Sequence, residues 1–224
     1  MLLLALGCRC RDAVVMQTSR DHAINLSFSD AVTVLMEACC VPPPARKAFE
    51  ARIRHLQRLG IPARPADERN SRITYGIVEL AMLATTFRLM AAFMIPVLAV
   101  RYVNERWAEL APFTLAGARD VLPEAYLARR PMTGGTVAVI EGNALADLGQ
   151  KGRLDERYAG ALGEVLVVDA DTRDIVLRVR GAGMVIDSRT YMPVIVTRTV
   201  ELAMATDADL AMELDRLRFV AGRR

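Results

Sequence analysis

The stretch that decides the fold of this chain runs from Pro42 to Tyr75 and reads PPPARKAFEARIRHLQRLGIPARPADERNSRITY. It contains eight Lys and Arg residues against three acids, a local balance of +5, whereas the whole chain carries a net charge of only +3. The positive charge is concentrated in one segment, as a surface that faces phosphates requires. We interpret this segment as a basic helix and a basic loop that contact nucleic acid. On charge alone, a merely solvated helix face stays an open alternative.

The overall composition is that of a folded protein. A chain of 224 residues with 53% hydrophobic content is long enough for one large or two small domains with their own cores. Arg suits bidentate contacts to phosphate or guanine, although a GC-rich coding bias would produce the same excess of Arg over Lys. The cysteines match neither a zinc knuckle nor a disulfide framework, which predicts reduced thiols in a cytoplasmic protein. The only lysines are Lys47 and Lys151, and the cysteines are Cys8, Cys10, Cys39 and Cys40.

Two helices are predicted before the basic loop. N-cap residues and helical spacing of apolar positions predict a first helix from about Ser29 to Cys40. The prolines 42–44 cannot continue it but suit the first turn of a second helix, which runs to about Leu59 and ends at Gly60. Residues 1–24 are expected to be a leader, which is either disordered or wrongly included because the start codon is misassigned.

A loop and a helical hairpin follow. Two prolines and a polar cluster between Ile61 and Thr74 predict a loop or a two-stranded wing. From Tyr75 the pattern is helical, and Pro96 starts a fresh helix. The apolar run Ile77–Val100 is about long enough to cross a bilayer, but Arg88 at its middle and the proline favour two buried helices over a membrane span.

The second half of the chain has strand character. Residues 111–131 contain prolines and a glycine and predict a linker, with a short helix around 115–121. Beyond it, β-branched runs separated by turn residues predict strands, and the chain closes with an amphipathic helix at about Val200–Phe219. The predicted strands are Thr136–Ile140, Glu164–Asp169, Asp174–Arg180 and Met192–Arg198.

No catalytic or metal-binding constellation is predicted. Nucleophilic triads and most metal sites need histidine, and the chain has only His22 and His55. The acidic cluster Asp169, Asp171 and Asp174 lacks the Gly and the downstream Glu of a calcium loop, which favours a turn between two strands. We therefore expect a protein that is not an enzyme and has no catalytic residues, no cofactor and no metal.

The order of these elements resembles the winged helix-turn-helix DNA-binding domain of MerR-type transcriptional regulators over about residues 26–107. The sequence RIRHLQRLGIP (52–62) is similar to the recognition helix of that family, and RNSRITY (69–75) is similar to its wing. The long dimerising coiled coil that usually follows in the family is absent after Trp107. The resemblance implies an all-α winged-helix domain at 25–110. With the linker at 111–131 and the smaller α/β domain at 132–224 that the residue pattern predicts, the expected fold class is α+β.

The resemblance also implies a function. The chain would be a sequence-specific, cytoplasmic and nucleoid-associated regulator that binds double-stranded DNA as a homodimer, with RNA polymerase or another regulator as a further partner and no membrane. Arg101 is a weaker candidate for a contact to the DNA backbone. The implied DNA-binding residues are Arg46, Lys47, Arg52, Arg54, His55 and Arg58 on the helix, and Arg64, Arg69, Arg72 and Tyr75 at the wing.

A different class of function stays open. The strand-rich C-terminal half could be the active part of a protein–protein interaction or scaffold module, with the basic segment as a solvated surface.

Overall fold

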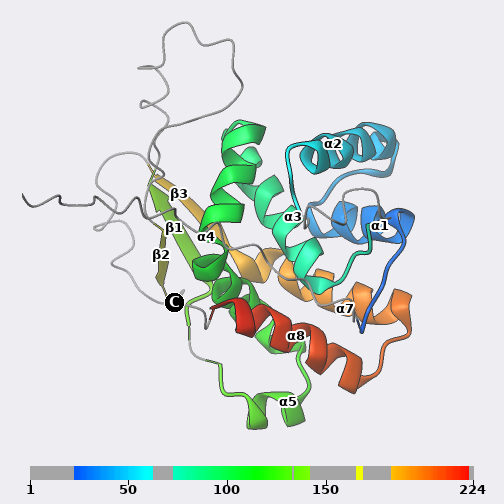
Figure 1. Cartoon of the computed structure of the whole chain (residues 1–224), viewed down its shortest axis with the longest axis vertical. Coiled ribbons are helices and arrows are strands. Elements are labelled where there is room, and N and C mark those ends of the chain that lie inside the picture. The colour runs from blue at the N-terminus through cyan, green and yellow to red at the C-terminus, as the bar shows by residue number, and fades with distance from the viewer. Residues whose placement is uncertain (1–22, 63–72, 133, 142–164, 169–182, 222–224) are drawn as a thin grey trace, which may run out of the picture.

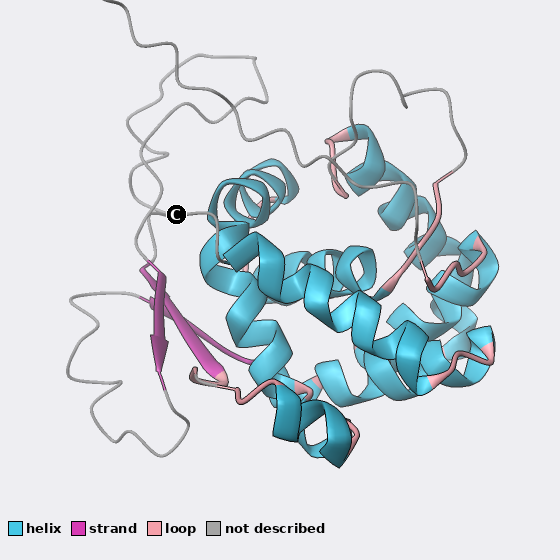
Figure 2. Ribbon diagram, turned by 60° about the horizontal axis from the view of Figure 1, so that its bottom comes forward, coloured by secondary structure: helices cyan, strands magenta, loops and turns pink. Residues whose placement is uncertain are grey.

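The computed structural model describes residues 23–62, 73–132, 134–141, 165–168 and 183–221. This part of the chain is mostly helical, with a small sheet against one side of the helices (Figures 1 and 2). The helices are α1 (Phe28–Ala38), α2 (Arg46–Arg58), α3 (Ile77–Ala91), α4 (Pro96–Gly117), α5 (Glu124–Arg129), α7 (Met192–Ala203) and α8 (Asp207–Ala221). The strands are β1 (Val137–Glu141), β2 (Val165–Val168) and β3 (Gly183–Asp187).

Local signals decide where α1 and α2 begin and end, and both predicted helices are confirmed. The side chain of Ser27 caps α1 by accepting a hydrogen bond from the backbone N–H of Asp30 at 3.2 Å. The prolines form a short 3-10 turn, Pro43–Ala45, that leads directly into α2. After α2, Gly60 has a φ of +99°, a conformation that favours glycine, so the chain turns away at the expected residue.

Helix α3 occupies the interior, and the predicted hairpin of α3 and α4 is confirmed. Twelve of the fifteen residues of α3 are buried, on all sides of the helix. This explains why the run has no polar face. Pro96 stands in the first turn of α4, as expected. No helix in the described part of the chain is long and apolar enough to cross a membrane.

The strands form an antiparallel sheet in the order β2-β1-β3. Ala138 on the central strand lies opposite Val167 of β2 and Ile186 of β3. The predicted strands at 136–140 and 164–169 are thereby confirmed in position, whereas the predicted strand at 174–180 lies outside the described residues. The acidic turn residues Asp169, Asp171 and Asp174 also lie outside them.

The predicted strand at 192–198 is wrong, because this segment is helix α7. Its buried residues Met192, Ile195, Val196 and Thr199 follow helical spacing, so burying a helical stripe outweighs the β-propensity of the branched side chains. The predicted C-terminal helix at 200–219 is divided. Helix α7 ends before Met204, which has a positive φ of +49°, and α8 starts at Asp207.

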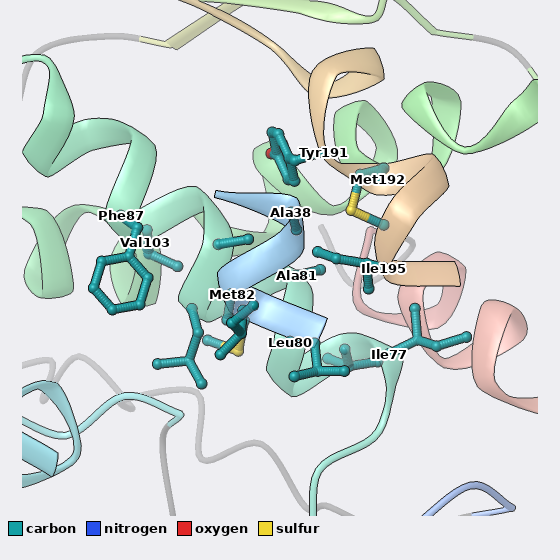
Figure 3. Packing of buried hydrophobic residues seen from close by; sticks show 14 of the residues in the cluster. Ala38, Ile77, Leu80, Ala81, Met82, Phe87, Val103, Tyr191, Met192 and Ile195 are labelled. Carbon is teal, nitrogen blue, oxygen red and sulfur yellow. The ribbon is translucent and has the colours of Figure 1, made fainter. Parts of the chain in front are cut away.

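One hydrophobic core draws on both sides of the predicted linker. In Figure 3, Ala38 of α1 and Ala81 of α3 lie close to Met192 and Ile195 of α7. The start of the predicted linker belongs to α4, which continues through Pro112 to Gly117. Among the described residues, buried side chains from before and after 111–131 therefore belong to one hydrophobic cluster.

Candidate nucleic-acid interface

Helix α2 packs against α3 through its apolar face and is hydrogen-bonded to α4 at its C-terminal end. The rings of Phe49 and Phe87 lie 4.7 Å apart, and the side chains of Ile53 and Leu56 are buried. At the far end of the helix, the backbone oxygen of Gly60 accepts a hydrogen bond at 3.2 Å from the amide of Asn104 on α4. These contacts leave the opposite face of α2 in solvent.

One flank of α2 is bound to α1 by arginines. Arg46 forms an ion pair with Glu50 at 3.2 Å and donates to the backbone oxygen of Ser29 and to the hydroxyl of Thr33, each at 3.1 Å. The guanidinium of Arg54 lies 4.8 Å from the ring centre of Phe28, and it reaches Glu50 at 3.5 Å. Arg46 therefore serves the packing of two helices, whereas the side chain of Arg54 is still 54% exposed.

The outward face of α2 carries further cations and shares Arg54 with the flank that meets α1. Lys47, Ala51, Arg54 and Arg58 are spaced i, i+4, i+7 and i+11, so they form one stripe about 17 Å long on the helix. Within the part of the chain that the structure describes, Lys47, Arg52 and Arg58 form no ion pair and no side-chain hydrogen bond. His55 is half-buried beside them. The exposed residues of the helix are Lys47, Ala48, Ala51, Arg52, Arg54 and Arg58, so this face contains no acid.

The charges at the start of α2 oppose the helix macrodipole. Arg46 and Lys47 occupy the first turn, which contains no acid and has no side-chain cap. A cation at this end of a helix costs roughly 0.3–1 kcal/mol relative to the favourable end. A bound anion would relieve this cost.

The predicted DNA contact by Tyr75 is wrong for this arrangement. Tyr75 is only 1% exposed, and its hydroxyl accepts a hydrogen bond from the amide of Gln57 on α2. Its backbone oxygen accepts from the N–H of Leu26 at 2.9 Å. A buried ring cannot reach a duplex. Tyr75 instead anchors the chain at the point where the predicted wing ends.

The other predicted wing contacts, Arg64, Arg69 and Arg72, lie outside the described residues. The weaker candidate Arg101 forms an ion pair at 2.7 Å with Glu105, one turn further along α4.

Two features of the site were not predicted. In the sequence, Glu50 counts only as an acid that lowers the local charge, whereas in the structure it orients both Arg46 and Arg54. The small residues Ala48 and Ala51 were not expected at the site either. Their position opposite the apolar residues Phe49, Ile53 and Leu56 is visible in the sequence, and the structure buries those three residues.

Comparisons of this chain with protein-family models, with curated proteins and with solved structures found no match.

Proposed function

We propose that this chain is a sequence-specific DNA-binding transcriptional regulator, in which α2 lies in the major groove and the basic segment at 61–74 holds adjacent phosphates. The observation that carries the proposal is the acid-free outward face of α2. A helix with its side chains is about 10–12 Å wide, and the major groove of B-DNA is about 12 Å wide. Ala48 and Ala51 add little bulk, so the backbone of the helix could lie close to the base edges.

The exposed arginines suit separate tasks. Arg52 and Arg58 have no competing partner among the described residues and can each form a bidentate pair with guanine. Lys47, at the start of the helix, suits a phosphate contact. One such helix covers a half-site only, so the proposal includes a homodimer on a two-fold site, with RNA polymerase or another regulator as a further partner.

A duplex selected from a randomised pool by the full-length protein provides the test. Replacing Arg52 and Arg58 together by Ala should weaken binding to the selected duplex by at least about tenfold, because each bidentate pair contributes about 1–3 kcal/mol of discrimination. It should also reduce the preference over unselected duplexes. The matched control replaces Arg119 and Arg129, two exposed arginines near and within α5, by Ala. This control removes the same charge and should change affinity much less.

The wing makes a second, distinguishable contribution. Replacing Arg69 and Arg72 by Ala should weaken binding to all duplexes alike and lower the slope of log K against log salt by about 1 for each phosphate that is no longer neutralised. If both double variants bind the selected duplex like the wild type across a salt titration, the proposal is wrong.

The competing function is a protein–protein interaction or scaffold module that acts through the strand-rich C-terminal half. On β3, the side chain of Val185 is 59% exposed, which such a module could use. A selection that enriches no duplex, together with specific capture of a protein that Val185→Lys abolishes, would favour this function over DNA binding.

A further inference from the structure

The turn between α3 and α4 is an exposed apolar tip. Phe93 is 97% exposed and Ile95 is 52% exposed, and no charged residue occurs between Arg88 and Arg101. Phe93 also has a φ of +69°, in the left-handed region that favours glycine over bulky side chains. An aromatic residue here is both strained and in contact with water. Neither property helps the chain to fold, which indicates a functional reason for the residue.

The tip lies on the same side of the molecule as α2 (Figure 1). Phe93 lies two residues beyond the end of α3, the helix whose Phe87 contacts Phe49 of α2. Arg46 and Arg54 reach α1 from the other flank of α2, so Arg52 is turned away from α1. Figure 1 shows α2 and the joined ends of α3 and α4 on the same, upper side of the molecule, opposite α5. A partner that covers α2 from this side also meets the tip.

The size and shape of the tip indicate its partner. A stable interface with a second protein copy buries about 800 Å² on each side, more than a turn with two strongly exposed apolar side chains supplies. A single aromatic ring on a convex turn instead fits the gap between two base pairs, where apolar wedges unstack and kink a duplex. Arg52 and Arg58 on α2, which pair with no other described residue, complement the phosphates on either side of such a step.

We propose that Phe93 is a wedge that inserts between two base pairs of the duplex held by α2 and bends it. This inference rests on the proposed function, because α2 must first bring the tip to the DNA. Phe93 contributes through stacking and carries no charge, so its contribution to affinity is independent of salt.

The wedge can be tested without harming the fold, because Phe93 is 97% exposed and so makes almost no contact with the other described residues. Bending is measured by energy transfer between dyes at the two ends of the selected duplex, and affinity by titration. Phe93→Ala and Phe93→Gly should abolish most of the bending and weaken binding by about tenfold, with an unchanged salt slope. Phe93→Trp should retain both. The matched control is Met204→Ala, which removes another apolar side chain, 89% exposed and at a positive φ, from the α7–α8 turn. It should bend and bind like the wild type.

Two results would overturn the inference. The first is wild-type bending and affinity in Phe93→Ala and Phe93→Gly while the Arg52 and Arg58 variant still loses binding; the proposed function then stands and the wedge does not. The second is Phe93-dependent sedimentation of the protein with vesicles of phosphatidylglycerol, without any effect of Phe93 on DNA, which assigns the tip to a lipid surface. If no variant on α2 affects DNA binding, the proposed function itself has failed, and the wedge with it.

Discussion

Helices α2 and α3 have similar lengths, and both contain charged residues, but they use their charges in different ways. In α3, Arg88 donates to the backbone oxygen of Ala38 at 2.8 Å, and Glu79 binds Arg216 at 3.1 Å. In α2, Arg52 and Arg58 have no such partner in the described part of the chain. The difference teaches that burial, and not the number of charges, decides whether a charged side chain serves the fold or stays available to a ligand.

The buried Glu79 of α3 belongs to a network that ties the start of this helix to α8. Glu79 accepts a hydrogen bond from the N–H of Gly76 at 2.9 Å, and the fully buried Glu213 accepts one from the N–H of Ile77 at 3.3 Å. Arg216 bridges both carboxylates. A Cβ at Gly76 would lie 2.4 Å from Glu213, so the position has no room for a side chain.

The largest effect on stability is expected from Arg216→Ala. The substitution leaves two buried carboxylates without their cation, so the free energy of unfolding should fall by about 3–5 kcal/mol. Part of the loss should be recovered in the double variant with Glu79→Gln. Urea denaturation measures both. The control is Arg101→Ala, which breaks a more exposed pair with Glu105 and should cost less than about 1 kcal/mol. If the two variants lost the same free energy of unfolding, the proposed difference between buried and exposed ion pairs would be wrong.

An intermediate loss of stability is expected when Gly60, at the end of α2, is replaced. Gly60 has a φ of +99°, and nothing lies within 4 Å of the place where a Cβ would stand. Gly60→Ala should therefore cost about 1–2 kcal/mol through backbone strain alone. Gly60→Asn should cost less, because Asn tolerates positive φ better. Thermal unfolding compares the two variants, and an Ala variant as stable as the wild type would show that strain does not end this helix.

The smallest effect is expected for the reactivity of two cysteines at neutral pH. Cys39 and Cys40 show the same contrast between a buried and an exposed side chain in adjacent residues. Burial raises the pKa of the Cys39 thiol to about 11, outweighing the nearby charge of Arg88. Cys40 is exposed. Iodoacetamide should therefore alkylate Cys40 well before Cys39 at neutral pH, as peptide mapping would detect, since the thiolate is the reactive form. Faster labelling of Cys39 would refute its burial.

The same pKa shift predicts how stability depends on pH. Because the thiol of Cys39 ionises less readily in the folded protein, its contribution to stability is fully present below about pH 9 and is lost as the pH rises towards 11. Cys39→Ala should remove this part of the alkaline loss.

The sequence was informative where a signal is local. The prolines before α2, Gly60 after it and Pro96 at the start of α4 each act through their own backbone, and the structure confirms all three boundaries. The segment 192–198 shows the limit. Its Val and Ile residues favour a strand, yet Met192, Ile195 and Val196 are buried at helical spacing in the common core. Apolar residues at helical spacing were present in this segment, but its β-branched residues led to the prediction of a strand.

The candidate site divides in the same way. The amino-acid sequence by itself determined that α2 is a basic amphipathic helix with a defined start and end, because residue type and spacing along the chain suffice for this. Only the tertiary structure decided which charges remain available. The approach of α1 engages Arg46, the core buries Tyr75, and packing on α3 leaves Lys47, Arg52 and Arg58 in solvent. Such outcomes depend on contacts between residues far apart in the chain, which no local pattern contains.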